Sequence, residues 1–433
     1  MSKEQSRDRR PRNSGPPARP ATNGHTALAA RNGHRALPIL ITGGAGFIGT
    51  NLAHRLLSAK RKVILYDNLS RPGVEQNLAW LKATHGDLVR FERADVRDFE
   101  RLRKTVRGVS QVFHFAAQVA VTTSLDSPIE DFEINARGTL NLLEALRSLT
   151  EPPPLVFTST NKVYGDLKRV KLRMSRGRYE PVDQSVREHG FDEACALHFH
   201  SPYGCSKGAA CQYVMDYART FGLRAVVFRM SCIYGPHQFG TEDQGWVAHF
   251  LIKALERSPL TIYGDGRQVR DVLFVEDLVE AFLQAQRHIE PLAGQAFNLG
   301  GGPANTTSLL ELMELIGELH GQRPEVRYAD WRPADQQYYV SDTRRFSAAT
   351  GWSPNVDVRT GVTRLYEWLK EFRQVDTSRI IGLGRFNRLR NGELKRVFTH
   401  AMRPRTVAGK RTLKLKTARN GHGRMALHKV QAT

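Results

Sequence analysis

The amino-acid sequence predicts an α/β protein with a doubly wound parallel sheet and a smaller C-terminal lobe. Three observations predict this fold class: a strand-helix-strand unit around a glycine-rich turn near the start, an alternation of strand-like and helical patterns up to about residue 235, and a looser pattern beyond it. With 433 residues, the chain is also long enough for more than one folding unit.

The first unit lies in the segment LPILITGGAGFIGTNLAHRLLSAKRKVILYDNLS. An apolar run at 38–42 predicts one strand, and a second run at 63–66 predicts its partner. Between them, Ile48, Leu52 and Leu56 follow the turn at intervals of four residues, which places them on one face of a helix. This unit therefore begins the predicted sheet.

Further strands and helices alternate along the chain. Strand-like runs occur at 88–91, 111–115, 154–158 and 224–229, and helical patterns occur at 99–106, 130–148 and 206–221. Such alternation is typical of a parallel sheet that is covered by helices on both faces. A long polar insertion at 165–200 interrupts the pattern.

The charge of the chain is concentrated at its two ends. There are 64 Lys and Arg against 43 Asp and Glu, a formal net charge of +21. Residues 1–38 carry +6 and residues 377–433 carry +14, so the stretch 39–376 is nearly neutral at +1. We predict a disordered basic extension at 1–36 and a basic C-terminal extension at 377–433, which could contact polyanions or a membrane surface.

Composition argues against several classes of protein. No apolar stretch of about 18 residues is present, so we expect no integral membrane segment. No apolar run follows the positive charges near the N-terminus, which argues against a secretory signal and predicts a cytoplasmic protein. The four cysteines include no C-x-x-C pair, so we expect neither a disulfide framework nor a metal site from them.

The glycine-rich turn has the features of a dinucleotide site. Gly43, Gly46 and Gly49 open a helix after a strand, where missing side chains let the backbone approach a pyrophosphate. Asp67 ends the second strand 21 positions after Gly46, where its carboxylate can accept both ribose hydroxyls and would repel a 2′-phosphate. The pattern predicts a Rossmann-type fold with NAD as cofactor, the NAD-binding domain spanning 37–235.

Several further segments extend this pattern. TGGAGFIG, the pair Asp95 and Val96, HFAAQ, Asn135 and SPYGCSK resemble the extended short-chain dehydrogenase/reductase superfamily over about 39–370. The resemblance implies that Asp95 and Val96 flank the adenine, that the alanines of HFAAQ lie at the pyrophosphate and ribose, and that Asn135 braces the helix beneath the site. The implied cofactor residues are Gly43, Gly46, Phe47, Ile48, Gly49, Asp67, Asn68, Asp95, Val96, Ala116, Ala117, Gln118, Asn135, Thr158, Tyr203 and Lys207.

Tyr203 and Lys207 are the predicted reacting pair. Their i, i+4 spacing places both on one helix face, where the Lys207 ammonium and a positive nicotinamide ring would favour the Tyr203 phenolate. By the resemblance, Thr160 hydrogen-bonds the substrate oxygen and Lys207 contacts the nicotinamide ribose. Thr160, Tyr203 and Lys207 are thus the expected catalytic residues, with Tyr203 accepting the proton of a sugar hydroxyl while hydride passes to NAD.

The two residues after Thr160 separate related reactions. Nucleotide-sugar 4,6-dehydratases resemble this segment but carry Asp-Glu where this chain has Asn161 and Lys162. Elimination of water needs an acid and a base at that place, and an amide and an ammonium cannot replace them. The sequence therefore favours an epimerase, although a surface charge near a loop is an alternative interpretation of Lys162.

A longer resemblance implies the substrate. TSTNKVYGD, VTTSLDSPIEDFEINARGTLN, IYGDGRQVRDVLFVEDL and the segment 199–250 are similar to the CDP-paratose 2-epimerases, also called CDP-tyvelose epimerases. This implies inversion at C2 of a CDP-linked 3,6-dideoxyhexose, a nucleotide-sugar substrate of O-antigen or polysaccharide biosynthesis. The implied substrate-binding residues are Thr122, Thr123, Ser124, Asn161, Cys232, Arg270, Arg332 and Asp335.

These residues have different expected roles. Arg270 and Arg332 would reach the diphosphate and Asp335 the ribose, while Cys232 stands where many 4-epimerases carry an asparagine. We expect 236–376 to be mainly a substrate-binding lobe, with the insertion 165–200 directed toward the substrate and the loop 237–246 covering the sugar.

Two alternatives stay open. A 4-epimerase of a UDP- or GDP-linked sugar, or a related sugar-nucleotide oxidoreductase, would use the same catalytic residues. An NAD-binding protein whose basic extensions hold a polyanion would leave them idle. The superfamily resemblance also implies a homo-oligomer, a dimer or tetramer, with the helices at 99–106 and 206–221 as candidates for the contact.

Overall fold

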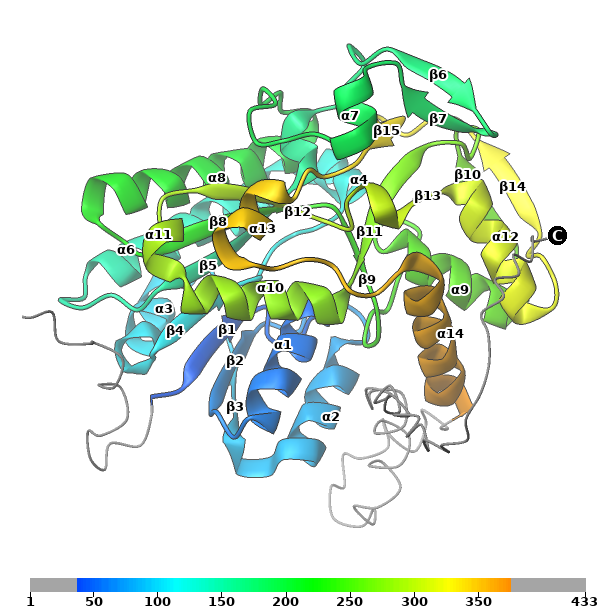
Figure 1. Cartoon of the computed structure of the whole chain (residues 1–433). Helices are drawn as coiled ribbons and strands as arrows, with labels where there is room; N and C mark the ends of the chain where they lie inside the picture. The colour runs from blue at the N-terminus through cyan, green and yellow to red at the C-terminus, as the bar shows by residue number, and fades with distance from the viewer. Residues whose placement is uncertain (1–36, 375–433) are drawn as a thin grey trace, which may run out of the picture.

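A seven-stranded parallel sheet forms the centre of the protein. The computed structural model describes residues 37–374, so the extensions predicted at 1–36 and 377–433 lie outside the described residues. The strand order is β12-β8-β5-β4-β1-β2-β3, and every neighbouring pair is parallel (Figure 1). The strands are β1 (Ile39–Thr42), β2 (Val63–Asp67), β3 (Val89–Arg93), β4 (Gln111–His114), β5 (Leu155–Thr160), β8 (Ala225–Met230) and β12 (Ala296–Leu299). The predicted fold class is confirmed.

The strand order shows where a ligand is expected to bind. β1 has β2 and β3 on one side and β4, β5, β8 and β12 on the other, so the order reverses between β1 and β4. Ile39 of β1 is in register with Val63 of β2 and Gln111 of β4. Open sheets of this kind bind ligands beyond the carboxyl ends of the strands at such a reversal.

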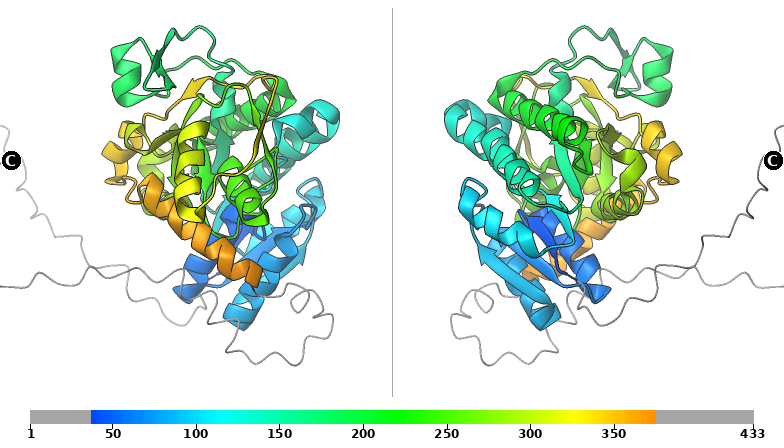
Figure 2. Two further views of the ribbon diagram at one scale, coloured as in Figure 1. Left: turned by 90° about the vertical axis from the view of Figure 1, so that its right-hand side faces the viewer. Right: turned by 90° about the vertical axis from the view of Figure 1, so that its left-hand side faces the viewer.

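Helices cover both faces of the sheet (Figures 1 and 2). Leu102, Leu142 and Val214 belong to the core on one face, and Leu52 and Phe282 belong to the core on the other. The first face carries α3 (Phe99–Thr105), α5 (Pro128–Phe132), the π-helix η3 (Glu133–Arg137), α6 (Gly138–Arg147) and α8 (Ser201–Phe221), and the second carries α1 (Phe47–Ser58), α2 (Val74–His85) and α10 (Val275–Arg287). Because helices cover both faces, every residue of β1, β4, β5 and β12 is buried, whereas the edge strand β3 leaves Arg90 and Arg93 exposed.

The remaining elements form a smaller lobe beside the carboxyl ends of the strands (Figure 1). In one small sheet β11 pairs with β9, β13 and β15, and β10 pairs separately with β14. These elements are β9 (Cys232–Tyr234), α9 (Trp246–Glu256), β10 (Leu260–Tyr263), β11 (Val269–Phe274), β13 (Thr306–Ser308), α12 (Leu309–His320), β14 (Val326–Ala329), β15 (Tyr338–Tyr339), α13 (Arg344–Thr350) and α14 (Val358–Gln374). Among residues 37–374, no helix has the length and apolarity that a membrane span requires.

Part of 236–376 joins the central layer instead of the smaller lobe. β12 pairs with β8 at the edge of the sheet, and α10 packs on the sheet beside α1. Without β12, the edge of β8 would present unpaired backbone groups. The stretch expected to be mainly substrate-binding is therefore divided between the two layers.

The insertion 165–200 forms a hairpin and a short helix. β6 (Leu172–Ser175) and β7 (Arg178–Pro181) pair antiparallel, and α7 (Gln184–His189) follows them. The hairpin stands out from the body in both views of Figure 2. Arg178 ties it to the smaller lobe, because its guanidinium lies 3.2 Å from Glu311 and donates to the Thr306 hydroxyl at 3.1 Å.

Candidate active site

A cavity of about 550 Å³ lies beyond the carboxyl ends of the central strands. Every predicted cofactor residue except Asn135 lines it, although these residues come from β1 through α8. Tyr203 and Lys207 line the same cavity, and so do residues 237–239 and Asp243 of the loop expected to cover the sugar. The fold thus brings together most of the residues that the spacing and the resemblance selected.

The glycine turn leaves room for a phosphate to approach the backbone. Gly43 has a φ of +66°, and a Cβ there would lie 2.7 Å from the Ala116 nitrogen. A Cβ on Gly49 would overlap the Gly43 carbonyl oxygen. Gly46 is the N-cap residue of α1 and has no side chain that could bond the first backbone N–H groups of the helix. The helix N-terminus therefore faces the cavity with these donors open to a bound anion. This shape fits the pyrophosphate of a dinucleotide.

Asp67 is held at the cavity by the turn that precedes α1. Its carboxylate accepts hydrogen bonds from the backbone nitrogens of Ala45 at 3.0 Å and Leu69 at 2.9 Å. Burial raises the pKa of Asp67 above its usual range, and those backbone donors oppose the rise. Next to it, Asn68 donates to Asp95 at 2.8 Å. These groups fit the ribose and adenine end of NAD.

The predicted reacting pair, Tyr203 and Lys207, lies at the start of α8. The Lys207 ammonium donates to the Thr158 carbonyl at 2.7 Å and lies 4.5 Å from the centre of the Phe157 ring. Burial lowers the pKa of Lys207 to about 8. Burial also raises the pKa of Tyr203 to about 12, against a hydrogen bond from Thr160 and the charge of Arg71. The expected lowering of the Tyr203 pKa is therefore not a property of the protein alone, because the loss of water outweighs the nearby donors.

Asn135 lies behind the cavity and connects three segments. Its side-chain oxygen accepts from the Gln118 nitrogen at 3.0 Å, and its amide donates to the Gln118 carbonyl and to the Ser206 hydroxyl at 3.1 Å each. Gln118 itself lines the cavity, and Ser206 lies on α8 beside Lys207. Asn135 thus joins the Gln118 segment to α8 without lining the cavity.

Of Thr122, Thr123 and Ser124, only Thr123 lines the cavity. The Ser124 hydroxyl accepts from the Tyr203 nitrogen at 3.1 Å and donates to the Val121 carbonyl at 2.7 Å. These contacts make Ser124 a support for the start of α8, and they correct its prediction as a substrate-binding residue. Thr122 is half-buried beside it in α4 (Val121–Asp126), and its buried hydroxyl has no hydrogen-bond partner among the described residues.

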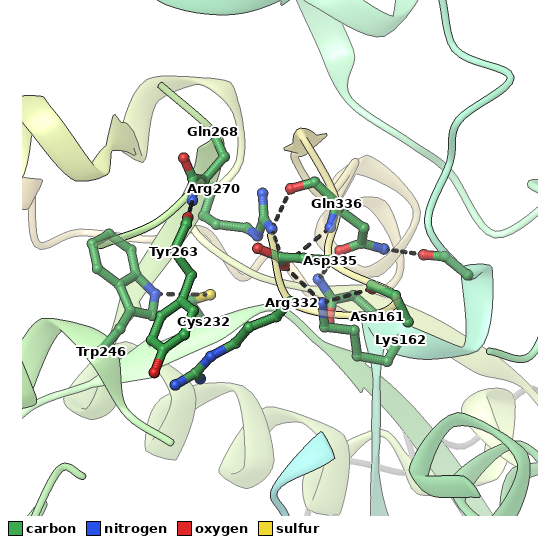
Figure 3. Close-up of polar contacts among 12 residues, drawn as sticks. Asn161, Lys162, Cys232, Trp246, Tyr263, Gln268, Arg270, Arg332, Asp335 and Gln336 are labelled. Atoms are coloured by element: carbon green, nitrogen blue, oxygen red, sulfur yellow. Dashed lines mark hydrogen bonds and ion pairs between the residues drawn. The ribbon is translucent and has the colours of Figure 1, made fainter. Parts of the chain in front are cut away.

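Asp335 is the centre of a polar cluster next to the end of β5 (Figure 3). Its carboxylate lies 2.8 Å from Arg270 and 3.3 Å from Lys162. These two cations hold the pKa of Asp335 below its usual value although burial opposes them. Lys162 is only 20% exposed, and burial lowers its pKa. Lys162 is therefore a fixed partner of Asp335, which corrects its interpretation as a surface charge.

Three further predicted substrate residues, Asn161, Cys232 and Arg332, lie around this cluster (Figure 3). Asn161 donates to Gln336 at 3.3 Å, and the Cys232 sulfur accepts from the Trp246 indole at 3.4 Å. Arg332 lies 3.9 Å from the centre of the Tyr263 ring. Asn161, Cys232, Arg332, Thr160, Arg270 and Asp335 do not line the 550 Å³ cavity, so these six form a second group beside the cofactor residues, whereas Thr123 lies with the cofactor residues.

Two arginines that hold the loop 237–246 connect the two groups. Arg332 donates to the Glu242 carbonyl at 3.0 Å and lies 3.5 Å from the Asp243 carboxylate. Arg71 donates to Gln244 at 3.2 Å and lines the cavity. Arg71 was not predicted from the sequence. Its only local signal is its position four residues after Asp67, in the turn before α2.

Together, the Rossmann sheet, the glycine turn and the Tyr203–Lys207 pair define a dinucleotide-dependent enzyme of the short-chain type. The chain belongs to the NAD dependent epimerase/dehydratase family, which matches residues 39–300. This match confirms the predicted superfamily, and it confirms NAD as the cofactor.

The comparisons with individual proteins extend over nearly all of each relative. A CDP-paratose 2-epimerase of Salmonella typhi is 44% identical over 339 residues, covering 77% of this chain and 99% of that protein. The structure of a UDP-glucose 4-epimerase of Thermotoga maritima with UDP-glucose has a TM-score of 0.66 and 30% identity, covering 78% of this chain and 100% of that one. The UDP-glucose 4-epimerase of Thermus thermophilus with NAD has a TM-score of 0.64 and 32% identity, with the same two coverages.

Proposed function

We propose that the protein is an NAD-dependent nucleotide-sugar epimerase of the CDP-paratose 2-epimerase type. The observation that carries the proposal is the ion pair of Lys162 with Asp335 beside Thr160, in a chain 44% identical to a CDP-paratose 2-epimerase. Lys162 stands where a dehydratase would need a carboxyl group, and its ammonium group donates a hydrogen bond to the Asp335 carboxylate. Epimerisation needs no acid or base at that place.

The catalytic residues are proposed to act on one carbinol carbon. When bound, NAD supplies a reversible hydride acceptor and a positively charged ring. Tyr203 takes the hydroxyl proton as the carbon becomes a ketone, and it returns the proton when the carbon is reduced on the other face. Thr160, which hydrogen-bonds Tyr203, orients the hydroxyl, and Lys207 holds the ribose from its place on Thr158. No net oxidation results.

The nucleotide is proposed to stay anchored while the sugar turns. Arg270 and Arg332 supply guanidinium groups that suit a diphosphate, and Asp335 between Lys162 and Arg270 suits the ribose. A fixed anchor keeps the ketosugar near the hydride during reorientation. The cytoplasmic location and the homo-oligomer stay predictions.

The test is to present the purified full-length protein with a panel of CDP-, UDP- and GDP-linked sugars in deuterated water. We expect NMR of the products to show inversion at C2 of CDP-paratose, with no deuterium at the inverted carbon because the hydride is internal. Inversion at C4 of a UDP- or GDP-sugar would support the second candidate, which the similarity to UDP-glucose 4-epimerase structures favours. Deuterium at the inverted carbon would contradict both.

A further inference from the structure

Two histidines and an aspartate meet where the insertion 165–200 leaves and rejoins the body. One ligand atom each of Asp166, His198 and His200 lies within 4.8 Å of the others, and none of the three residues lines the NAD cavity. We infer that Asp166, His198 and His200 form a binding site for a divalent transition metal of the zinc class. The inference does not depend on the proposed function, because no step of epimerisation uses these residues.

The backbone holds the three residues near one another. The His198 nitrogen donates to the Val163 carbonyl at 2.9 Å. Gly165 has a φ of +76°, and a Cβ there would overlap the His198 carbonyl oxygen, so the two segments are in direct contact. His200 is extended, with a φ of −116° and a ψ of 148°, and alternate residues of an extended chain point to the same side. His198 and His200 therefore face Asp166 together.

The ligand chemistry selects the type of metal. Two imidazoles and one carboxylate suit zinc and its neighbours, whereas magnesium and calcium prefer oxygen ligands. Zinc binds such atoms at about 2.0–2.2 Å, which places tetrahedral ligand atoms roughly 3.3 Å apart. The His200 Nδ1 and Asp166 Oδ2 atoms are already 3.4 Å apart, and the exposed side chain of His198 can rotate to complete the set. Water would fill the remaining position.

A positive charge already lies at this carboxylate. The Lys168 Nζ atom is 3.3 Å from the same Asp166 oxygen that faces His200. The Lys168 side chain is 86% exposed, so it can move into solvent when a metal binds. Lys168 therefore acts as a competing cation, and its removal should strengthen metal binding.

A metal here would act on the geometry of the catalytic residues. His200 precedes Tyr203 by three residues on the way into α8, and Asp166 follows Thr160 by six. A bound metal would link the segment that follows β5 to the start of α8 and would fix the distance between these two elements. The site would thus be structural, without contact to substrate or cofactor.

The test measures zinc binding to the metal-free full-length protein by equilibrium dialysis, with thermal unfolding as a second readout. We expect one zinc ion whose affinity falls at least about 10-fold in His198→Ala and in His200→Ala. His288→Ala, at the end of α10, is the matched control and should retain the affinity of the wild type. Zinc should raise Tm in the wild type and in the control, but not in the two site variants.

Lys168→Ala distinguishes loss of a ligand from loss of folding, since a misfolded variant cannot bind more tightly. We expect its zinc affinity to increase several-fold. Equal affinity in the wild type, His198→Ala and His200→Ala would overturn the inference, because the bound zinc would then lie on other histidines. An unchanged or weaker affinity in Lys168→Ala would also contradict it.

Discussion

At the scale of single residues, burial determines the protonation of the reacting pair. In the protein alone the pKa of Tyr203 is raised to about 12 and that of Lys207 is lowered to about 8, because both side chains lose water on folding. Burial thus disfavours both charged forms, and an added positive charge would favour only the Tyr203 phenolate. This arrangement makes the ionisation of Tyr203 sensitive to a positive ring bound in the cavity.

Replacing Tyr203 tests its role as the proton acceptor. We expect Tyr203→Phe to lower kcat by about 10²–10⁴-fold, because the proton then has no acceptor, while the amount of bound NAD stays unchanged. Tyr213→Phe on the exposed side of the same helix is the control and should keep full activity. Turnover by Tyr203→Phe within twofold of the wild type would show that another group takes the proton.

The buried side chain of His114 makes the free energy of unfolding depend on pH. It is buried between Thr42 at 2.6 Å and Thr139 at 3.1 Å, and burial, with a smaller effect of Lys207, lowers its pKa from 6.5 to about 3. Between these two values the unfolded chain binds a proton that the folded protein does not. The contribution of neutral His114 to the free energy of unfolding is therefore complete above about pH 6.5, and it is lost as the pH falls toward 3.

A neutral replacement of His114 should make the protein less sensitive to acid. Between pH 7 and pH 5, urea unfolding of the wild type should show about 2 kcal/mol more loss of stability than that of His114→Gln. His54 and His237, whose pKa values burial lowers to about 4 and about 3, should leave a residual decline in the variant. His288→Gln should decline like the wild type, and an equal decline in His114→Gln would refute the prediction.

At the scale of elements, the end of β5 supplies residues to three parts of the site. Thr158 borders the cavity and accepts from Lys207, Thr160 hydrogen-bonds Tyr203, and Lys162 pairs with Asp335. The strand and the following 3₁₀ helix η4 (Asn161–Tyr164) thus align the cofactor, the reacting pair and the polar cluster. A shift of this one element would alter all three.

The turn between β1 and α1 should tolerate no side chain at Gly49. A methyl group there would overlap the Gly43 carbonyl oxygen and approach the Gly44 Cα to 2.8 Å, so the turn must open. We expect Gly49→Ala to weaken NAD binding at least about 10-fold, measured by calorimetry on cofactor-free protein, since the pyrophosphate loses its close backbone approach. Gly108→Ala, where nothing lies within 4 Å of the added Cβ, should bind NAD normally. Normal NAD binding by Gly49→Ala would contradict this account.

At the scale of the whole molecule, the described residues 37–374 contain both groups of site residues, while most of the net charge lies outside them. The match to the epimerase/dehydratase family, residues 39–300, lies within the nearly neutral middle of the chain. We therefore expect the extensions to be dispensable for catalysis.

Removing the extensions tests this separation. A chain limited to 37–376 should keep the kcat of the full-length protein, because the cavity and the polar cluster are complete within it. If the extensions bind polyanions, the full-length protein should bind RNA or anionic vesicles in a salt-dependent way, and the shortened chain should not. A large loss of turnover on shortening would show that the extensions contribute to the site.

Local sequence patterns were sufficient to predict the sheet and to select residues that line one cavity. The glycine turn, Asp67 and the Tyr203–Lys207 spacing each lie within one strand-helix-strand unit or one helical turn, where spacing fixes geometry. Which distant residues meet could be seen only in the folded chain. Lys162 and Asp335 are 173 positions apart, and Ser124 meets the Tyr203 backbone from 79 positions away. Such pairs depend on the path of all the chain between them, about which local periodicity carries no information.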